Sequence, residues 1–197
     1  MNPLSDSELQ DIVHQVLQRT MRGGEFPFST VPDRDGAASE PLAPQPATKK
    51  EQTISLGADH GGFTLKESIK AFLQKEGYQV DDCGTHSTES VDYPDFAYEV
   101  ARRVSEGKSW RGIMIDGAGI GSCMVANKVP GVRAAMCYDH ATAVNSREHN
   151  DANVLTIGAG LIGPNLAIQI VQTWLSTEFA GGRHLRRVDK IMTIERR

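Results

Sequence analysis

The chain of 197 residues lacks three features that would each place it in a particular class of protein. It has no excess of basic residues, since 21 Lys and Arg stand against 25 Asp and Glu, and this balance indicates no nucleic-acid partner. It has no apolar run near the roughly 18 residues that a membrane-spanning helix needs. Its N-terminus has acidic residues where a secretory signal would be basic and then apolar. We therefore expect a cytoplasmic protein with neither a nucleic-acid nor a membrane partner.

Cysteine is also scarce. Cys83, Cys123 and Cys137 are far apart and odd in number, so they fit neither a disulfide framework nor a zinc-ligand spacing. This pattern is typical of reduced thiols in a cytosolic protein. The length allows one domain with a sizeable core and an appendage.

The appendage is at the N-terminus, where residues 1–20 have the pattern of an isolated amphipathic helix. Ser5 and Glu8 have the spacing of a capping box. Apolar residues recur at helical spacing and form one stripe: Leu9, Ile12, Val13, Val16 and Leu17. A helix this short is marginal in water by itself, so it needs a surface to dock on. That surface belongs either to another protein or to the rest of this chain or its dimer.

Residues 21–50 differ in composition, because Pro, Gly, Ala and Ser dominate there. This is the composition of a flexible linker that buries no core. The sequence therefore predicts three parts, namely a helix at 1–20, a linker at 21–50 and a folded domain at 51–197.

The domain alternates between strand and helix patterns. Strands are expected at residues 53–58, 78–83, 112–115, 133–138 and 154–159. Helices are expected between them and at the end, at 63–76, from 95 to about 104, at 123–128, near 140–148, at 164–176 and at 185–196. Strictly alternating elements favour parallel strands with right-handed crossovers. The predicted fold class is α/β, a three-layer α/β/α sandwich with a five-stranded parallel Rossmann-like sheet.

Residues 112–122 are the stretch around which the domain is organised. An apolar run ends in Asp116, and a glycine-rich turn from Gly117 to Gly121 leads into a helix. Glycine allows the close approach and positive φ with which such a loop presents backbone N–H groups to an anion. Asp116 would lie at the carboxyl end of a strand, where open α/β sheets bind ligands. The alternative is a tight connection with a solvated Asp. A dinucleotide site is disfavoured because the G-x-G-x-x-G spacing is absent.

Other polar groups flank the predicted strands and the last helix: Asp59, His60, His140, His149, Asn150, Arg183, His184, Arg186 and Arg187. If they converge, their carboxylates, imidazoles and guanidinium groups suit proton transfer on a small anionic substrate. Each also has a structural alternative, because a lone His is often a satisfied core or surface residue and an Arg-rich ending is often a solvated face.

Five short motifs appear in a fixed order along the domain: residues 57–63 (GADHGGF), 92–95 (DYPD), 117–121 (GAGIG), 146–153 (SREHNDAN) and 181–184 (GGRH). On these motifs the domain resembles the ribose-5-phosphate isomerase B family, which includes galactose-6-phosphate isomerase subunits. The resemblance implies an aldose–ketose isomerase that converts ribose 5-phosphate to ribulose 5-phosphate through an enediolate. It implies no metal and no cofactor. It also implies dimers or tetramers whose sites borrow residues from two subunits.

The resemblance assigns roles to particular residues. Asp116 stands at the position of a catalytic base, and Asp59 and His149 would serve ring opening and contact hydroxyl groups. Arg183, Arg187 and His60 would bind the phosphate, Asn150 a sugar hydroxyl, and the backbone N–H groups of the glycine loop the enediolate. The expected substrate-binding set is His60, Gly117, Ala118, Gly119, Ile120, Gly121, Asn150, Arg183, His184 and Arg187.

The sequence departs from the family at the proposed site. Asp116 replaces a Cys that many members use as base, and Ser122 replaces the Glu base of another branch. A hydroxyl side chain is missing at Ala118, and an Arg is missing at Gly160. These departures leave open a silent member that binds a sugar phosphate or assembles cargo. They also leave open a different substrate, such as a tetrose or deoxy sugar phosphate.

An amphipathic helix and linker before an enzyme domain resemble the encapsulation peptides of bacterial microcompartment cargo. The resemblance implies that residues 1–20 bind shell or other cargo proteins, either by helix-in-groove contacts or by co-aggregation. The expected location is then the lumen of a microcompartment within the cytoplasm.

Overall fold

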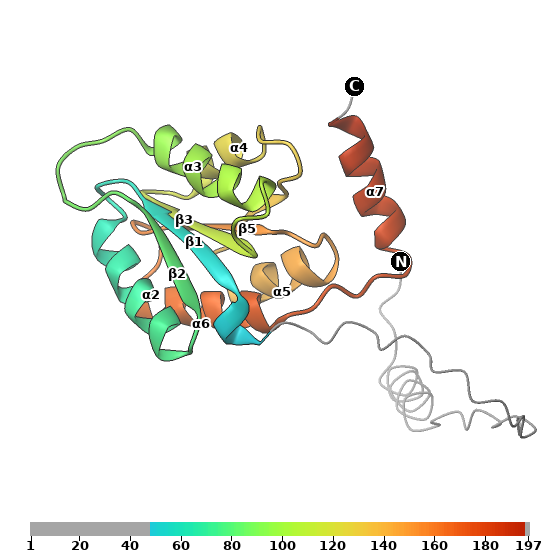
Figure 1. Cartoon of the computed structure of the whole chain (residues 1–197), viewed down its shortest axis with the longest axis horizontal. Helices are drawn as coiled ribbons and strands as arrows, with labels where there is room; N and C mark the ends of the chain where they lie inside the picture. The colour runs from blue at the N-terminus through green and yellow to red at the C-terminus, as the bar shows by residue number, and fades with distance from the viewer. Residues whose placement is uncertain (1–47, 196–197) are drawn as a thin grey trace, which may run out of the picture. The chain divides into compact units, whose positions relative to one another are not determined.

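The computed structural model describes residues 48–195 of the chain (Figure 1). The predicted helix at residues 1–20 and nearly all of the predicted linker lie outside the described residues. The described part begins at Thr48 and a single 3-10 turn, η1 (Lys49–Glu51), which leads directly into the first strand. No helix in residues 48–195 is long and apolar enough to cross a membrane.

The centre of the fold is a sheet of five strands. They are β1 (Thr53–Ala58), β2 (Gln79–Gly84), β3 (Arg111–Asp116), β4 (Ala134–Met136) and β5 (Val154–Gly158). Their order across the sheet is β2-β1-β3-β5-β4, and each neighbouring pair is parallel. The predicted five-stranded parallel sheet is therefore confirmed.

One predicted strand is shorter than expected. The sequence predicted residues 133–138, but β4 ends at Met136. The reason is the start of the next helix, because the backbone N–H groups of Tyr138 and Asp139 both face the hydroxyl of Thr142. The Asp139 carboxylate caps the same helix by accepting a hydrogen bond from the Thr142 N–H. These local bonds turn the chain out of the sheet.

Helices cover both faces of the sheet (Figure 1). On one face lie α2 (Phe63–Lys75), α5 (His140–Glu148) and α6 (Pro164–Ser176), and on the other lie α3 (Tyr93–Ser105) and α4 (Ile120–Ala126). The three-layer sandwich predicted from the sequence is confirmed. The helix predicted at 123–128 starts three residues earlier, at Ile120.

Each face of the sheet has its own apolar core. Because side chains alternate along a strand, Ile113 and Ile115 pack with α2 and α6 around the fully buried Trp174. Met114, which points the other way, packs with Val100 of α3. Apolar packing on both faces fixes the direction of β3. It therefore positions Asp116, the last residue of this strand.

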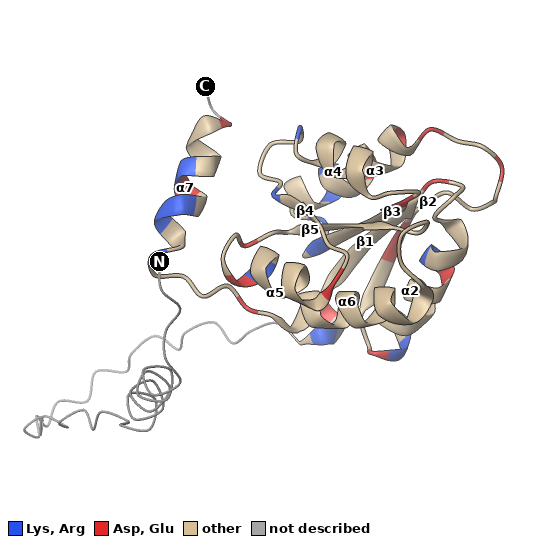
Figure 2. Cartoon of the chain, turned by 180° about the vertical axis from the view of Figure 1, so that it is seen from behind, with Lys and Arg blue, Asp and Glu red and all other residues tan. Residues whose placement is uncertain are grey.

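The last helix, α7 (Leu185–Ile194), lies beside the sandwich. Val188 is buried, and the Glu195 carboxylate accepts a hydrogen bond of 2.6 Å from the Gly131 N–H. Figure 2 marks positions of Lys and Arg in blue along the ribbon of this helix. Ile191 and Ile194 remain about half and two-thirds exposed, at 48% and 66%. The described chain thus ends in a helix that leaves part of its apolar surface uncovered.

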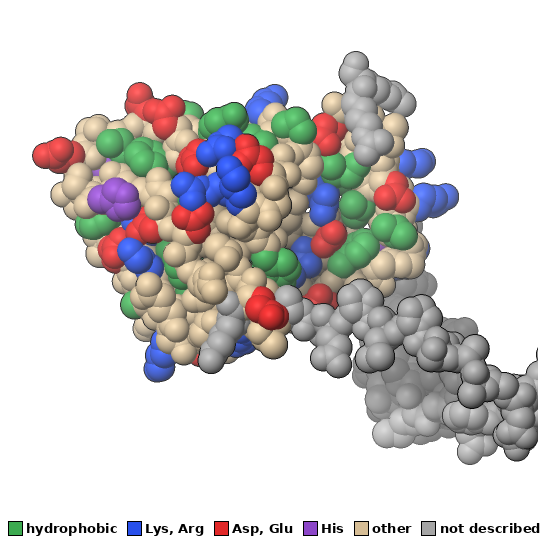
Figure 3. Space-filling model, in the orientation of Figure 1, with side chains coloured by type: hydrophobic (Ala, Val, Ile, Leu, Met, Phe, Trp, Pro, Cys, Tyr) green, Lys and Arg blue, Asp and Glu red, His purple; other side chains and the backbone are tan. Residues whose placement is uncertain are grey.

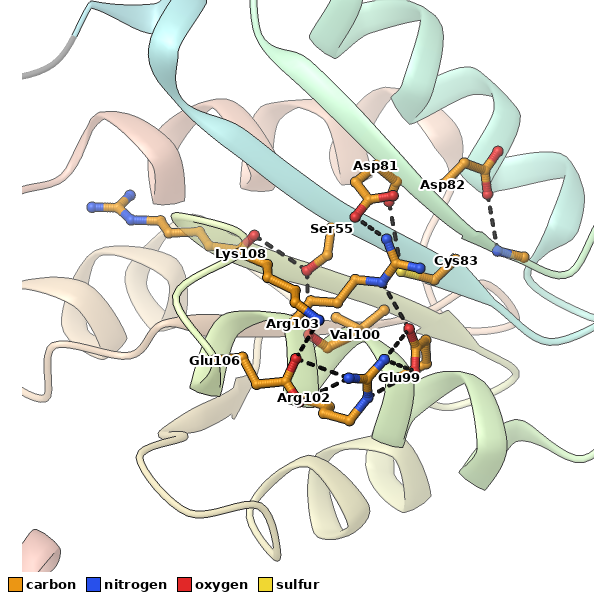
Figure 4. A network of polar contacts seen from close by, with 12 residues as sticks. Ser55, Asp81, Asp82, Cys83, Glu99, Val100, Arg102, Arg103, Glu106 and Lys108 are labelled. Carbon is orange, nitrogen blue, oxygen red and sulfur yellow. Dashed lines mark hydrogen bonds and ion pairs between the residues drawn. The ribbon is translucent and has the colours of Figure 1, made fainter.

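A network of charged side chains joins α3 to the edge strand β2 (Figure 4). Arg103 bonds both Asp81 and Glu99, and Arg102 bonds both Glu99 and Glu106. Figure 3 shows a cluster of blue and red side chains over α3. The hydrogen bond from Arg103 is the largest cause that lowers the pKa of Glu99. Because the network is largely solvated, we expect it to contribute little to stability.

A second ion pair, between α2 and β2, is buried. Lys66 Nζ is 2.7 Å from Asp82 Oδ1, and Lys70 Nζ is 2.6 Å from Asp82 Oδ2. Burial alone would raise the pKa of Asp82, but the hydrogen bonds from Lys66, Lys70 and the Gly84 N–H outweigh it and lower this pKa to about 2. Since the Lys66 side chain has no exposed surface, the pair depends on both partners being charged.

We expect Asp82→Asn to lower the free energy of unfolding at neutral pH by about 3 kcal/mol, because the buried Lys66 then keeps only the partly exposed Glu67, 3.0 Å away, as its charged partner. The Asp82 contribution should be complete above pH 3.8, the ordinary pKa, and should be lost as the pH falls through about 2. Urea unfolding at pH 7 and at pH 2 measures both effects. Asp81→Asn, in the solvated network, is the matched control. A loss as large in the control as in Asp82→Asn would contradict this prediction.

Candidate active site

The first part of the candidate site lies where β1 ends. The Asp59 N–H donates to the Ile115 carbonyl of β3 at 3.1 Å, so the ends of these two strands lie side by side. The Asp59 carboxylate accepts a hydrogen bond of 2.9 Å from the Gly62 N–H, and its residue is only 8% exposed. A side chain at position 62 would overlap the Ile115 carbonyl, which explains the glycine. His60 is exposed, with Nδ1 3.2 Å from the Val91 carbonyl.

The second part is Asp116 at the end of β3, which is 4% exposed. One oxygen of its carboxylate accepts hydrogen bonds from the N–H groups of Ala118, at 2.8 Å, and Gly119. The other oxygen accepts from the Ser122 N–H, at 3.1 Å, and from the Ser122 hydroxyl. A carboxylate has about four acceptor positions, and this one has four donors. Asp116 is therefore held in place by the loop that follows it.

This arrangement differs from the expectation that the loop's N–H groups are open to a substrate. In the structure without substrate, the N–H groups of Ala118 and Gly119 already bind the chain's own carboxylate. Ile120 and Gly121 open α4, where the first N–H groups of a helix have no intrahelical partner. The sequence predicted that this loop presents N–H groups to an anion, but it could not show that Asp116 occupies part of the loop.

The loop is supported from both sides. Gly119 has φ of 78°, a conformation that favours glycine, and its carbonyl accepts a hydrogen bond of 2.8 Å from the Thr156 hydroxyl of β5. A Cβ at Gly121 would lie 2.5 Å from the Tyr93 ring, so this ring packs on the loop backbone. From the sequence, residues 92–95 were used only as a family motif, and Tyr93 had no predicted role at the site. An aromatic residue inside a motif of short polar residues was the available signal.

The remaining predicted residues form a separate group around two stacked imidazoles. The His149 and His184 rings lie 4.2 Å apart and nearly parallel. Asn145 Nδ2 is 2.8 Å from His149 Nδ1, and Arg183 Nε donates to His184 Nε2 at 3.3 Å. Burial, the neighbouring His149 and two arginines lower the pKa of His184. Asn150, Arg183 and Arg187 are exposed beside these rings or on the adjoining helix.

Within one chain, the Asp116 group lies at the carboxyl ends of the strands and the His149 group lies at their amino ends. Because α5 runs back between two parallel strands, its end at His149 lies near the start of β5, while Asp116 pairs with Gly158 at the end of β5. A strand of this length separates them by about 16 Å. The structure therefore does not bring His149, Arg183 and Arg187 to Asp59 and Asp116 in one chain. His140, at the start of α5, and Arg186, on α7, are exposed and belong to neither hydrogen-bonded group.

None of the three cysteines offers a reactive thiolate. Burial raises the pKa of Cys123 and Cys137, and it raises the pKa of Cys83 to about 12. Their thiols are therefore protonated at neutral pH. The only acidic groups buried at the carboxyl edge of β1 and β3 within residues 48–195 are Asp59 and Asp116. This edge can accordingly offer carboxylates, backbone N–H donors and the Ser122 hydroxyl to a ligand.

Comparison with known proteins identifies the class to which this fold and site belong. The profile of the family described as Ribose/Galactose Isomerase matches residues 54–191. Ribose-5-phosphate isomerase B of Escherichia coli is 46% identical over 144 residues, which are 73% of this chain and 97% of that protein. D-erythrulose-4-phosphate isomerase of Pectobacterium atrosepticum is 45% identical over 140 residues, 71% of this chain and 92% of that protein.

Solved structures agree. Ribose-5-phosphate isomerase B of Clostridium thermocellum has a TM-score of 0.73 at 54% identity, covering 74% of this chain and 98% of that one. The Mycoplasma genitalium enzyme, solved with bound ribulose-5-phosphate, has a TM-score of 0.72 at 40% identity, covering 74% and 97%. The chain belongs to the ribose/galactose isomerase family. It is an aldose–ketose isomerase, as the resemblance implied.

Proposed function

We propose that the chain converts ribose 5-phosphate to ribulose 5-phosphate through an enediolate. The observation that carries the proposal is the pair of buried carboxylates, Asp59 and Asp116, on neighbouring strand ends beside a loop of backbone N–H donors. Moving a proton between C1 and C2 needs a base and donors for the oxygen that gains charge. The relatives named for ribose-5-phosphate isomerase B support the substrate.

In the proposed mechanism, Asp116 takes the proton from C2 of the open-chain aldose and returns it to C1. A second proton moves from the C2 hydroxyl to the oxygen on C1, which gives the ketose. The electron pair released at C2 forms the C1–C2 double bond of the enediolate while negative charge collects on the carbonyl oxygen. To act as base, the carboxylate oxygen that accepts from Ala118 and Gly119 must lose both of these hydrogen bonds. The N–H groups of Ala118 and Gly119 then become available to the enediolate oxygen, so the same donors serve the free enzyme and the intermediate.

We further propose that two copies complete each site. The proposed roles require both groups at one substrate. Asp59 and His149 open the sugar ring, and Asn150 contacts a hydroxyl. The phosphate is bound by His60, Arg183, His184 and Arg187. One chain holds these groups at opposite edges of the sheet. A homodimer, or a tetramer built from two such dimers, that places the His149 group of one subunit against the Asp116 group of the other satisfies this requirement.

The test is an isomerase assay with ribose 5-phosphate and D-erythrulose 4-phosphate. The second sugar is included because one relative bears its name and because Ala118 and Gly160 lack the side chains expected for a pentose phosphate. We expect a higher kcat/KM for ribose 5-phosphate. A higher value for the tetrose would reassign the substrate. Binding of either sugar without turnover would support the alternative, a silent member that binds sugar phosphates or assembles cargo.

We also propose that residues 1–20 direct the enzyme into a bacterial microcompartment, on the strength of their apolar stripe and capping box. Fused to a fluorescent protein, residues 1–20 should give punctate fluorescence in cells that make shells. Replacing Ile12 and Leu17 by Asp in the fusion should make it diffuse, because each puts a charge on the stripe. Diffuse fluorescence from the unaltered fusion would argue against targeting.

A further inference from the structure

A cleft of about 370 Å³ lies at the amino edge of the sheet, the edge opposite Asp59 and Asp116. Its walls come from the residues just before the first three strands and from the ends of α2 and α6. The apolar part consists of Phe72, Tyr78, Trp110 and Leu175. No step of the isomerase reaction uses this cleft.

Two aromatic rings of the cleft lie close to each other and to neighbouring cations. The Tyr78 and Trp110 rings are nearly parallel, with centroids 6.5 Å apart. Lys49 Nζ lies 5.1 Å from the centre of the Tyr78 ring, and the Arg111 guanidinium lies 4.0 Å from the centre of the Trp110 ring. Each ring therefore makes a cation–π contact. Trp110 still has 37% of its surface exposed.

Two hydrogen-bond donors at the cleft are unused. The Trp110 indole N–H and the Gln172 side-chain amide have no hydrogen-bond partner among residues 48–195. The charged residues of the lining do have partners or add negative charge. Lys49 and Glu76 form an ion pair of 3.2 Å, and Glu178 adds a negative charge. An anionic occupant such as a sugar phosphate is thus disfavoured, and a neutral one with free carbonyl groups fits.

The chain itself supplies such a segment next to the cleft. Thr48 is the first described residue, and Lys49 is part of the lining. The four residues immediately before them are Pro44, Gln45, Pro46 and Ala47, which carry no charge. In a polyproline II conformation four residues reach about 12 Å and leave all their carbonyls unpaired. Aromatic grooves bind proline-rich segments by packing on the rings and donating to those carbonyls.

We propose that the cleft binds residues 44–47 of its own chain, with Pro44 and Pro46 on the Tyr78 and Trp110 rings. The indole N–H of Trp110 donates to a carbonyl of the segment. This contact fixes where the N-terminal extension leaves the domain, beside the residues that precede β1, β2 and β3. The proposal does not depend on which sugar phosphate is the substrate.

Fluorescence quenching of the full chain tests this contact. The chain has two tryptophans, and Trp174 is fully buried, so acrylamide quenching reports on Trp110. We expect Pro44→Gly with Pro46→Gly to increase the quenching constant by about two-fold, because the segment then leaves the ring. Pro27→Gly with Pro32→Gly is the matched control and should leave quenching unchanged. Trp110→Phe gives the baseline from Trp174.

The remaining outcomes each decide the proposal. Recovery of protection when a peptide of residues 41–48 is added to the Pro44→Gly, Pro46→Gly chain supports the contact. Equal quenching in this variant and the unaltered chain overturns it. Protection that falls on dilution means that the segment comes from a second copy, which also overturns a contact within one chain. None of these readings uses enzymatic activity, so failure of the proposed function would not affect them.

Discussion

Asp116→Asn should lower kcat/KM for ribose 5-phosphate by at least about 100-fold, the usual scale for loss of a general base. The amide cannot take a proton from carbon, yet it has nearly the same size as the carboxylate. It can also still accept hydrogen bonds from the loop through its oxygen. The loss should therefore fall mainly on kcat, with KM changing little. Steady-state kinetics measured by ribulose 5-phosphate formation provides both constants.

Two controls separate chemistry from structure at this position. Asp139→Asn makes the same substitution at the cap of α5, outside both groups of the candidate site, and asparagine caps helices as well as aspartate does. It should keep the full rate. Ser122→Ala removes one of the four donors to Asp116 but keeps the carboxylate, and it should stay within about ten-fold of the normal rate. If Asp116→Asn is as active as the unaltered chain, Asp116 only fixes the loop and the base lies elsewhere.

Subunits that are each inactive should regain activity together. Asp116→Asn damages the group at the carboxyl edge, and Arg187→Ala damages the group around His149. If each site combines one group from either subunit, a mixed dimer holds one intact site and one with both defects. In the purified mixed dimer one of the two sites is intact, so about half of the unaltered specific rate should return. Co-expression with two affinity tags, followed by assay of the doubly purified dimer, measures this.

The matched control is a second change in the same group. Asp59→Asn mixed with Asp116→Asn places a defect in every site, so no activity should return. Recovery in this pair would mean that the two carboxylates do not act in one site. Absence of recovery for Arg187→Ala with Asp116→Asn, in a mixed dimer shown to form, would mean that each site is complete in one chain or that Arg187 has no part in it.

Much of the domain could be predicted because the relevant signals are local. Apolar runs followed by Gly or Asp marked the strands, and their alternation with helix patterns gave the parallel sheet and three layers. The exception, β4, ended early because Asp139 and Thr142 form a helix cap at its end. A cap is also a local signal, but the apolar residues Cys137 and Tyr138 extended the strand pattern across it.

The candidate site was predicted less completely, because proximity between distant residues has no local signal. The stacking of His149 on His184 joins residues 35 positions apart. The separation of this pair from Asp116 follows from the direction in which α5 crosses the sheet. The sequence argument counted strand ends without distinguishing the carboxyl from the amino edge, and so it expected one converging cluster.

The sequence by itself determined the class of fold, the position of the glycine loop and the membership suggested by five ordered motifs. These depend on residue type and spacing, which are fixed along the chain. Only the tertiary structure decided that Asp116 fills its own loop, that the predicted site is divided between two sheet edges, and that Tyr78 and Trp110 form a cleft beside Thr48. Each of these features depends on which side chains are buried together and on the end of the sheet at which a residue lies. Neither condition is fixed until the sheet has formed.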